Sequence, residues 1–441
     1  MAPSCLWSGV SRGLVARQPR DRQASSSRGV YEMQPQSPRS VADTRELRLF
    51  LEELCCNLLR FHHATAERVP PETISVNQEV NLGEAQGFAD IRVRLPSARP
   101  YFVEVKHGYP AGAIIDHLSR KYGLGSPLTK EASKVILVIE SREGDELERI
   151  EKELKKRLRR GLRLEIWTEE HLLKLLREQF GMEIESIGPE NVADLRQAVD
   201  QAKGRYAFGE GYANDPLQAT LLWHFGFWRL RQLMESRGPS PRAVLPPGSY
   251  RSVAVLFADL SSFSSYVRDT RDDAVIRHVL TSFYSKTRYE VLNSGGMMYQ
   301  FLGDGAIALF GVPESGDRSA GDALECARAL IDIGSAVSHE WQRSIDHVQG
   351  SGGAHIGMAL GDLDVVSLRP FSRTHVGVIG DSVNLAARLT SAAAAGEIVV
   401  SNALYNVLPE ELRQGFSEME PIEARNIGKI RAWKLGAVGL R

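Results

Sequence analysis

Two aspartates in the second half of the chain follow apolar segments, at positions where strands are expected to end. Asp259 closes the run VAVLFAD, and Asp304 lies within FLGDG. Further along, the sequence GDSVNLAAR places Asn384 and Arg388 four residues apart, on one face of a predicted helix. Two carboxylates that converge can hold a pair of divalent cations, Mn²⁺ or Mg²⁺, against a triphosphate. The set therefore predicts metal-assisted chemistry at a phosphate group, with an amide and a guanidinium reaching the reacting phosphorus.

The elements that must position these residues can be predicted from the surrounding pattern. Residues 251–260 alternate and are rich in strand-forming residues, so they predict a strand that delivers Asp259 at its end. A helix is expected over residues 273–293, and residues 297–310 then predict a hairpin. The tip of this hairpin carries Asp304, which can therefore lie beside the end of the first strand.

The residues directly after Asp259 are suited to bind phosphate. Ser261, Ser262 and Phe263 enter a predicted helix, and the free backbone amides at a helix start form a nest for phosphate oxygens. The positive end of the helix dipole points to the same place. We therefore expect this loop to hold phosphate next to the cations.

The ordered series resembles the catalytic domain of the class III nucleotidyl cyclases, and the resemblance covers Ser249 to Leu435. It implies a ferredoxin-like α/β sandwich that converts a nucleoside triphosphate to a 3′,5′-cyclic nucleotide and pyrophosphate. In this family both aspartates bind both cations, helped by the backbone carbonyl of the next residue, here Leu260. The asparagine orients the ribose, and the arginine neutralises charge at the α-phosphate. Residues implied to contact the substrate are Phe257, Ser261, Ser262, Phe263, Gln300, Gly377 and Lys429.

The resemblance also implies a dimer. In the family each site lies at a subunit interface, where one subunit supplies the metal ligands and the other supplies the asparagine and the arginine. This chain has both halves, so a head-to-tail homodimer with two equivalent sites is expected. One departure lies in the phosphate loop, where the family usually has a glycine at the position of Ser262.

Two residues bear on which base is bound. Adenylyl cyclases of the family have Lys and Asp or Thr where this chain has Gln300 and Gly377, and guanylyl cyclases have Glu at the first position. The glutamine amide offers one donor and one acceptor, which pair with the edge of uracil or cytosine. This favours a resemblance to the pyrimidine cyclases of the bacterial anti-phage system Pycsar, with UTP ahead of CTP and a downstream cyclic-nucleotide-responsive effector. An adenylyl cyclase with a relaxed base pocket, or a nucleotide-sensing module without turnover, remains an alternative.

The first half of the chain predicts a separate α/β domain over residues 41–183, opened by an amphipathic helix. Asp90 lies in GFAD on one predicted strand, and Glu104 and Lys106 share a face of the next. The arrangement resembles the restriction-endonuclease-like PD-(D/E)xK fold, which implies a metal ion and an attacking water. A metal-dependent nuclease is therefore an alternative function, and nucleic acid as a partner stays open. The plainer interpretation is a Glu–Lys pair in a domain that senses or docks something. The strands expected here cover 88–95, 101–106, 134–139 and 163–167, and a helix covers 169–180.

Composition sets the remaining expectations for this multidomain α/β chain of 441 residues and net charge −1. The near-zero charge gives no reason to expect nucleic-acid or membrane binding by the chain as a whole. Its four cysteines include no C-x-x-C spacing, and no apolar run approaches the roughly 20 residues that cross a bilayer, so a cytoplasmic protein without membrane contact is expected. The domains expected are a disordered tail over 1–40, the α/β domain over 41–183, a helical linker over 184–248 and the cyclase domain over 249–437. A start at Met33 or a transit peptide would also account for the Arg- and Ser-rich tail.

Overall fold

In the computed structural model, residues 42–441 form one compact unit. The residues described are 38–83, 87–123, 127–208, 216–238, 240–316, 318–345, 352–368, 375–424 and 428–436. Most of the expected tail, residues 1–37, lies outside this part, and the first helix begins at Pro38. No helix in the described ranges is long and apolar enough to cross a membrane.

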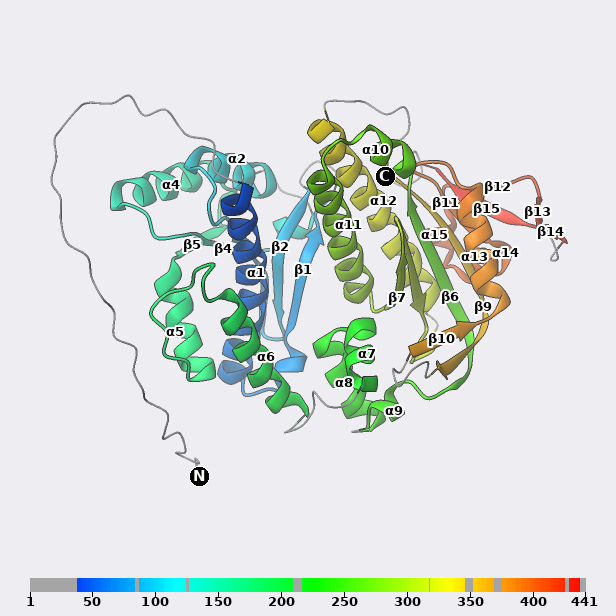
Figure 1. Ribbon diagram of the computed structural model, residues 1–441, viewed down its shortest axis with the longest axis horizontal. Helices are drawn as coiled ribbons and strands as arrows, with labels where there is room; N and C mark the ends of the chain where they lie inside the picture. The colour runs from blue at the N-terminus through cyan, green and yellow to red at the C-terminus, as the bar shows by residue number, and fades with distance from the viewer. Residues whose placement is uncertain are drawn as a thin grey trace. The chain divides into compact units, whose positions relative to one another are not determined.

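The amino-terminal half forms a five-stranded sheet in the order β1-β2-β3-β4-β5 (Figure 1). The first three strands are antiparallel, and β4 and β5 continue the sheet in parallel. Its elements are α1 (Pro38–Glu67), the 3₁₀ turn Pro71–Thr73, β1 (Ser75–Asn81), β2 (Phe88–Leu95), β3 (Ala98–Val105), α2 (Ala111–Tyr122), α3 (Pro127–Lys130), β4 (Lys134–Val138), α4 (Gly144–Arg157), β5 (Arg163–Trp167) and α5 (Glu169–Phe180). Helices α1 and α5 pack on one face and α2 and α4 on the other, which explains why residues 135–138 of the parallel strand β4 are all apolar and buried.

Strand β1 was not predicted from the sequence. Its residues, SVNQEVN, carry polar side chains on both faces, and all seven are only partly buried. The strand forms because it pairs with β2 at the edge of the sheet, and helix α11 (Asp273–Asn293) packs against it. Propensity alone gives little signal for such an edge strand.

The expected helical linker contains α6 (Val192–Phe208), α7 (Pro216–Phe225), α8 (Phe227–Arg237) and the short α9 (Pro241–Val244). The aromatic stretch in α7 and α8 packs against the second sheet. The imidazole Nδ1 of His224 lies 2.7 Å from the carbonyl of Met298, and the rings of Trp223 and Phe301 meet edge to face. Helices α7 and α8 are therefore part of the packing of the carboxy-terminal half, whereas α6 packs in the amino-terminal core.

The carboxy-terminal half is an eight-stranded sheet in the order β12-β15-β11-β9-β6-β8-β7, with β10 paired to β9. The chain order β6-α11-β7-β8-α12-β9 is the βαββαβ arrangement of ferredoxin-like folds, so the expected mixed α/β architecture is confirmed. Strands are β6 (Gly248–Leu260), β7 (Met297–Leu302), β8 (Gly305–Phe310), β9 (Ala354–Leu368), β10 (His375–Ile379), β11 (Ile398–Ser401), β12 (Phe416–Glu418) and β15 (Ala432–Leu435), with a separate pair, β13 (Ile422–Ala424) and β14 (Gly428–Ile430). Helices are α10 (Phe263–Asp269), α11, α12 (Ser319–Ile345), α13 (Asp381–Ala392), α14 (Asn402–Val407) and α15 (Glu410–Arg413).

Both faces of this sheet are covered. Helices α11 and α12 bury one face, while α13 and the linker helices α7 and α8 bury the other (Figure 1). Residues 253–256 of β6 are consequently all fully buried, whatever face they point to. Strand β6 thus delivers its last residues to a rigid edge of the sheet.

Candidate active site

The two aspartates lie side by side because strands β6 and β8 pair. Asp259 is opposite Gly305, the residue that follows Asp304 in the tight turn between β7 and β8. A side chain at Gly305 would place its Cβ 3.1 Å from the Asp259 carboxylate, so glycine leaves room for that carboxylate. Gly303, at the first position of the turn, has φ 60°, which suits a two-residue hairpin.

Mutual repulsion marks the carboxylate pair. Partial burial and then the neighbouring charge of Asp304 raise the pKa of Asp259 to about 6. A divalent cation would relieve this repulsion, and both side chains are only partly buried. Among the described residues no cluster of three or more His, Cys, Asp or Glu side chains is arranged to hold a metal. Two carboxylates, the Leu260 carbonyl, water and substrate oxygens would therefore complete the coordination, which is the ligand set that Mg²⁺ commonly takes.

The raised pKa predicts a pH-dependent cost of keeping Asp259. The pKa of Asp259 in the folded protein, about 6, exceeds its ordinary value, so folding favours the protonated carboxyl group. The contribution of this group to stability is therefore present at low pH and is lost as the pH rises through 6, where the carboxyl group ionises. Asp259→Asn should therefore stabilise the metal-free protein at pH 7.5 by about 1 kcal/mol, allowing for solvent screening, and not at pH 3.5. Urea unfolding in EDTA at both pH values measures this. An equal difference at both pH values would contradict it.

The loop after Asp259 differs in part from the expected phosphate nest. The amide of Ser261 donates to the carbonyl of Gly353 at 2.9 Å, so this amide is not available to phosphate. Ser262 adopts φ 62°, a left-handed conformation that favours glycine, which accounts for the glycine that the family usually has there. Phe263 packs edge to face on Trp341 and contacts the core, so packing fixes its position.

One residue of this site was missed from the sequence. His355 on β9 pairs directly across from Asp259, and its Nε2 lies 3.8 Å from an Asp259 carboxylate oxygen. Its Nδ1 lies 3.0 Å from the hydroxyl of Ser261. Burial lowers the pKa of His355, which favours the neutral imidazole. Only the strand register reveals this neighbour, because nearly a hundred residues separate it from Asp259.

Asn384 and Arg388 do not meet the aspartates within one chain. They lie on α13 as expected, with Asn384 exposed and Arg388 half-buried. A cavity of about 180 Å³ at Asp259 is lined from α13 by Ala387, Thr390 and Ser391 instead. The same helix sits close to β9, since a Cβ on Gly357 would lie 2.1 Å from the Thr390 amide.

The expected base-pocket residues lie on β7 and β10, two strands that do not pair with each other in the sheet. Gln300 is half-buried on β7, at a bulge in its pairing with β8, and Gly377 is buried on β10. The hydroxyl of Tyr299 hydrogen-bonds to the backbone of Val378, which brings the two strands together. Lys429 is exposed on β14.

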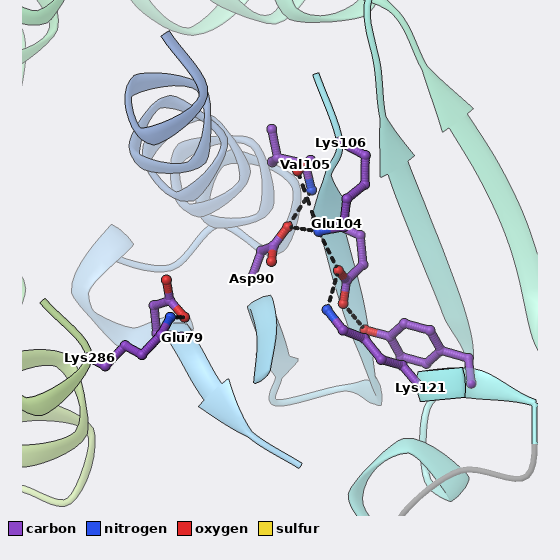
Figure 2. Close-up of polar contacts among 8 residues, drawn as sticks. Glu79, Asp90, Glu104, Val105, Lys106, Lys121 and Lys286 are labelled. Carbon is purple, nitrogen blue, oxygen red and sulfur yellow. Dashed lines mark hydrogen bonds and ion pairs between the residues drawn. The ribbon is translucent and has the colours of Figure 1, made fainter. Parts of the chain in front are cut away.

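The residues of the nuclease-like motif form a buried charge cluster (Figure 2). The ammonium of Lys106 lies 2.5 Å from Asp90 and 2.7 Å from Glu104. Two residues of α2 complete the cluster: Lys121 donates to one oxygen of Glu104 at 2.6 Å, and the Tyr122 hydroxyl donates to the other at 2.6 Å (Figure 2).

The lysines of this cluster already neutralise the carboxylates that a metal ion would need as ligands. Burial opposes ionisation of Asp90, but Lys106 and Lys121 outweigh it, so the pKa of Asp90 lies below its ordinary value. Both oxygens of Glu104, which is fully buried, already accept hydrogen bonds from Lys121 and Tyr122. Nuclease activity stays a prediction, and this arrangement leaves Glu104 little capacity to bind a metal.

Lys121 is expected to contribute to folding. Lys121→Met leaves the buried Glu104 carboxylate short of one cation and should lower the free energy of unfolding by about 3 kcal/mol. Lys155→Met, which removes an exposed ion pair of α4, should change it by less than about 0.5 kcal/mol. Urea unfolding followed by tryptophan fluorescence measures both. Equal stabilities of the two variants would contradict the structural role of Lys121.

The second half of the chain matches a known protein family. Residues 245–436 match the family model for the adenylate and guanylate cyclase catalytic domain. The uncharacterized protein Rv1319c of Mycobacterium tuberculosis is 33% identical over 142 residues, which are 32% of this chain and 24% of that protein. Rv1320c of the same organism is 32% identical over 142 residues, 32% of this chain and 23% of that protein. The chain thus spans about a quarter of the length of these curated relatives.

Solved structures of two cyclases each align with 43% of the chain. The crystal structure of the guanylyl cyclase Cya2 covers 43% of this chain and 92% of its own, with 24% identity and a TM-score of 0.37. The adenylyl cyclase CyaB from P. aeruginosa covers 43% and 95%, with 21% identity and a TM-score of 0.39. The residues matched by the family model, 245–436, include both aspartates and the Asn–Arg pair.

Proposed function

We propose that this chain cyclises a pyrimidine nucleoside triphosphate, proceeding from the class III nucleotide cyclase catalytic domain that residues 245–436 form. In the proposed reaction the ribose 3′-hydroxyl attacks the α-phosphorus, the new P–O bond closes the ring, and the bond to the β-phosphate breaks. The hydroxyl proton goes to water, and pyrophosphate leaves. Two bound Mn²⁺ or Mg²⁺ ions would lower the pKa of the hydroxyl and hold the triphosphate.

The observation that carries this proposal is the pairing of Asp259 with the turn that holds Asp304. Two carboxyl groups brought together at the ends of paired strands and partly open to solvent, with the pKa of Asp259 raised to about 6, are what a cation site needs before the cation binds. We assign Asp259, Asp304 and the Leu260 carbonyl to the metals.

The placement of α13 supports a dimeric site. Asn384 and Arg388 are not among the residues that line the cavity at Asp259, which supports the proposal that a second subunit supplies them to the reacting phosphorus. Leu302, two residues before Asp304, is 51% exposed, and Ile379, just before α13, is 62% exposed. Large apolar side chains exposed next to both half-sites suit a subunit interface. We propose a head-to-tail homodimer with Arg388 neutralising the α-phosphate and Asn384 orienting the ribose.

A substrate that lacks the attacking group tests the reaction itself. Purified protein with Mn²⁺ and UTP should yield 3′,5′-cyclic UMP and pyrophosphate in equal amounts, as measured by mass spectrometry and a pyrophosphate assay. The analogue 3′-deoxy-UTP should yield neither product. Formation of UMP in place of the cyclic product would show hydrolysis and overturn the proposal.

Gln300 is proposed to read the base. Gln300→Lys removes the paired donor and acceptor and supplies a cation, so kcat/KM for UTP relative to ATP should fall by about 100-fold. Gln414→Lys makes the same change on the exposed surface and should leave the ratio unaltered. Competition between UTP and ATP in one reaction measures the ratio directly. A ratio unchanged in Gln300→Lys would show that another residue selects the base.

The wider role follows from the product. We propose that the cyclic nucleotide is a second messenger in anti-phage defence, made in the cytoplasm and read by a separate cyclic-nucleotide-responsive effector. The amino-terminal domain would then regulate the rate. An adenylyl or guanylyl cyclase is the alternative on the same domain, and product identity separates the two.

A further inference from the structure

Helix α11 contacts the amino-terminal sheet and also the turn that carries Asp304. Its residues Tyr284 and Lys286 are two apart, so they point to different sides of the helix. Tyr284 reaches the catalytic turn, and Lys286 reaches strand β1.

Contacts on the catalytic side fix the turn. The hydroxyl of Tyr284 donates a hydrogen bond to the carbonyl of Gly303, the residue before Asp304. Its ring stacks on Phe301 with the centroids 4.2 Å apart and the planes 19° apart. Trp223 of α7 packs edge to face on Phe301, with centroids 6.0 Å apart. The turn therefore has an aromatic support on one side and a hydrogen bond at its first residue.

Polar contacts on the other side hold α11 to β1. Lys286 lies 2.6 Å from Glu79, and both side chains are less than one-fifth exposed (Figure 2). The Lys286 ammonium also lies over the ring of Phe88 at 5.0 Å. At the end of the helix, Asn293 accepts from Asn77 at 2.9 Å and donates to the carbonyl of Gln78 at 3.0 Å.

A small polar cavity lies beside this contact. Its volume is about 270 Å³, and it is lined from the amino-terminal domain by Glu52, Glu79 and Asp90 and from α11 by Ser282, Ser285 and Lys286. The motif residue Asp90 thus shares a cavity wall with the catalytic half. Glu79 contacts α11 directly through Lys286, and Asp90 lines the same cavity.

We propose that Tyr284 is a positioning residue for Asp304, and that the amino-terminal domain controls this positioning by holding α11 through the Glu79–Lys286 ion pair. A rigid helix couples the two contacts, because a shift of α11 away from β1 moves the Tyr284 hydroxyl relative to Gly303. The inference rests on the proposed function in one respect, which is that Asp304 binds the cation. It adds the route by which the first half of the chain sets the rate.

Cation binding tests the first step without requiring turnover. Full-length wild type and variants are titrated with Mn²⁺ alone, and free Mn²⁺ is followed by its electron paramagnetic resonance signal. Tyr284→Phe keeps the stacked ring and removes the hydroxyl, so the Kd of the Asp304-dependent site should rise about fivefold. Asp304→Ala defines that site by abolishing it, and Tyr289→Phe, which removes another hydroxyl from α11, should bind as wild type. Equal Mn²⁺ affinity in Tyr284→Phe and wild type would overturn the positioning role.

Charge reversal tests the second step. Glu79→Lys and Lys286→Glu should each speed hydrogen exchange at residues 300–306, and the double exchange should return it to the wild-type rate. The same single variants should lower kcat for cyclisation with less than a twofold change in KM, and the double variant should recover it. A double variant no better than the singles would overturn the coupling. If wild type forms no cyclic nucleotide, the proposed function fails, whereas the Mn²⁺ and exchange results still decide this inference.

Discussion

Replacing Asp259 by alanine is expected to abolish cyclic-nucleotide formation, by at least about 1,000-fold, while the protein stays folded. The carboxylate is partly open to solvent at the end of β6, so its removal takes away a metal ligand and leaves the core intact. Product formation in Mn²⁺, thermal unfolding and size-exclusion chromatography are measured on the same preparation.

The matched control for this variant is Asp322→Asn. Asp322 lies at the partly exposed start of α12, away from the paired strand ends, and its change should leave turnover within twofold of wild type. Cyclisation by Asp259→Ala at a rate comparable to that of the control would contradict the assignment of Asp259 to the metals.

Mixing two inactive variants, Asp259→Ala and Arg388→Ala, is expected to restore about a quarter of wild-type activity. With random exchange of subunits, half of the dimers contain one copy of each variant. Such a dimer has one undamaged site and one site with both lesions, because the aspartates and the arginine at each site come from different subunits. Co-expression with two different affinity tags, followed by an assay of the unselected protein, measures this recovery, and the mixed dimer purified through both tags should show about half of wild-type activity because one of its two sites is undamaged.

A second mixture provides the control for subunit exchange. Asp259→Ala and Asp304→Ala damage the same half of the site, so each site in their mixed dimer lacks one aspartate and no activity should return. Arg388→Ala alone should lower kcat by about 100-fold or more with a smaller effect on nucleotide binding. Recovery in both mixtures, or in neither, would contradict a shared site.

Sequence patterns were sufficient where a segment's own residues decide its structure. Residues 88–95, 163–167, 169–180 and 273–293 have the expected bounds because local signals mark their ends, such as the two glycines that follow Asn293 and Ser294. The hairpin with Asp304 at its tip was also expected, since the Gly303 and Gly305 positions favour a tight turn. The order of motifs was enough to predict the domain that the family model matches.

Contacts between distant segments account for what was missed. Strand β1 is polar on both faces and exists through its pairing with β2 and its contact with α11. Glu104 is hydrogen-bonded by Lys121 and Tyr122. Both belong to helix α2, whose packing against the sheet cannot be inferred from sequence spacing. His355 reaches Asp259 only through the register of β9 on β6. In each case tertiary structure supplies the partner, and local sequence carries no sign of it.

These contacts change the interpretation of the nuclease-like motif in the amino-terminal half. Its motif residues Asp90, Glu104 and Lys106 do come together, but a second lysine, Lys121, joins them, so two lysines balance the two carboxylates. Such a cluster stabilises a domain that touches the catalytic half through β1. Regulation of the cyclase is therefore a better-supported role for it than cleavage of nucleic acid.

The most direct test of the central claim is a single reaction containing equal concentrations of ATP, GTP, CTP and UTP with Mn²⁺ and the purified protein. Cyclic products are separated and identified by mass, with Asp259→Ala as the blank. Cyclic UMP, or cyclic CMP, as the dominant product is the result that this account predicts. Dominant cyclic AMP or cyclic GMP would keep the cyclase and overturn the pyrimidine assignment, and no cyclic product from any nucleotide would contradict the proposed function itself.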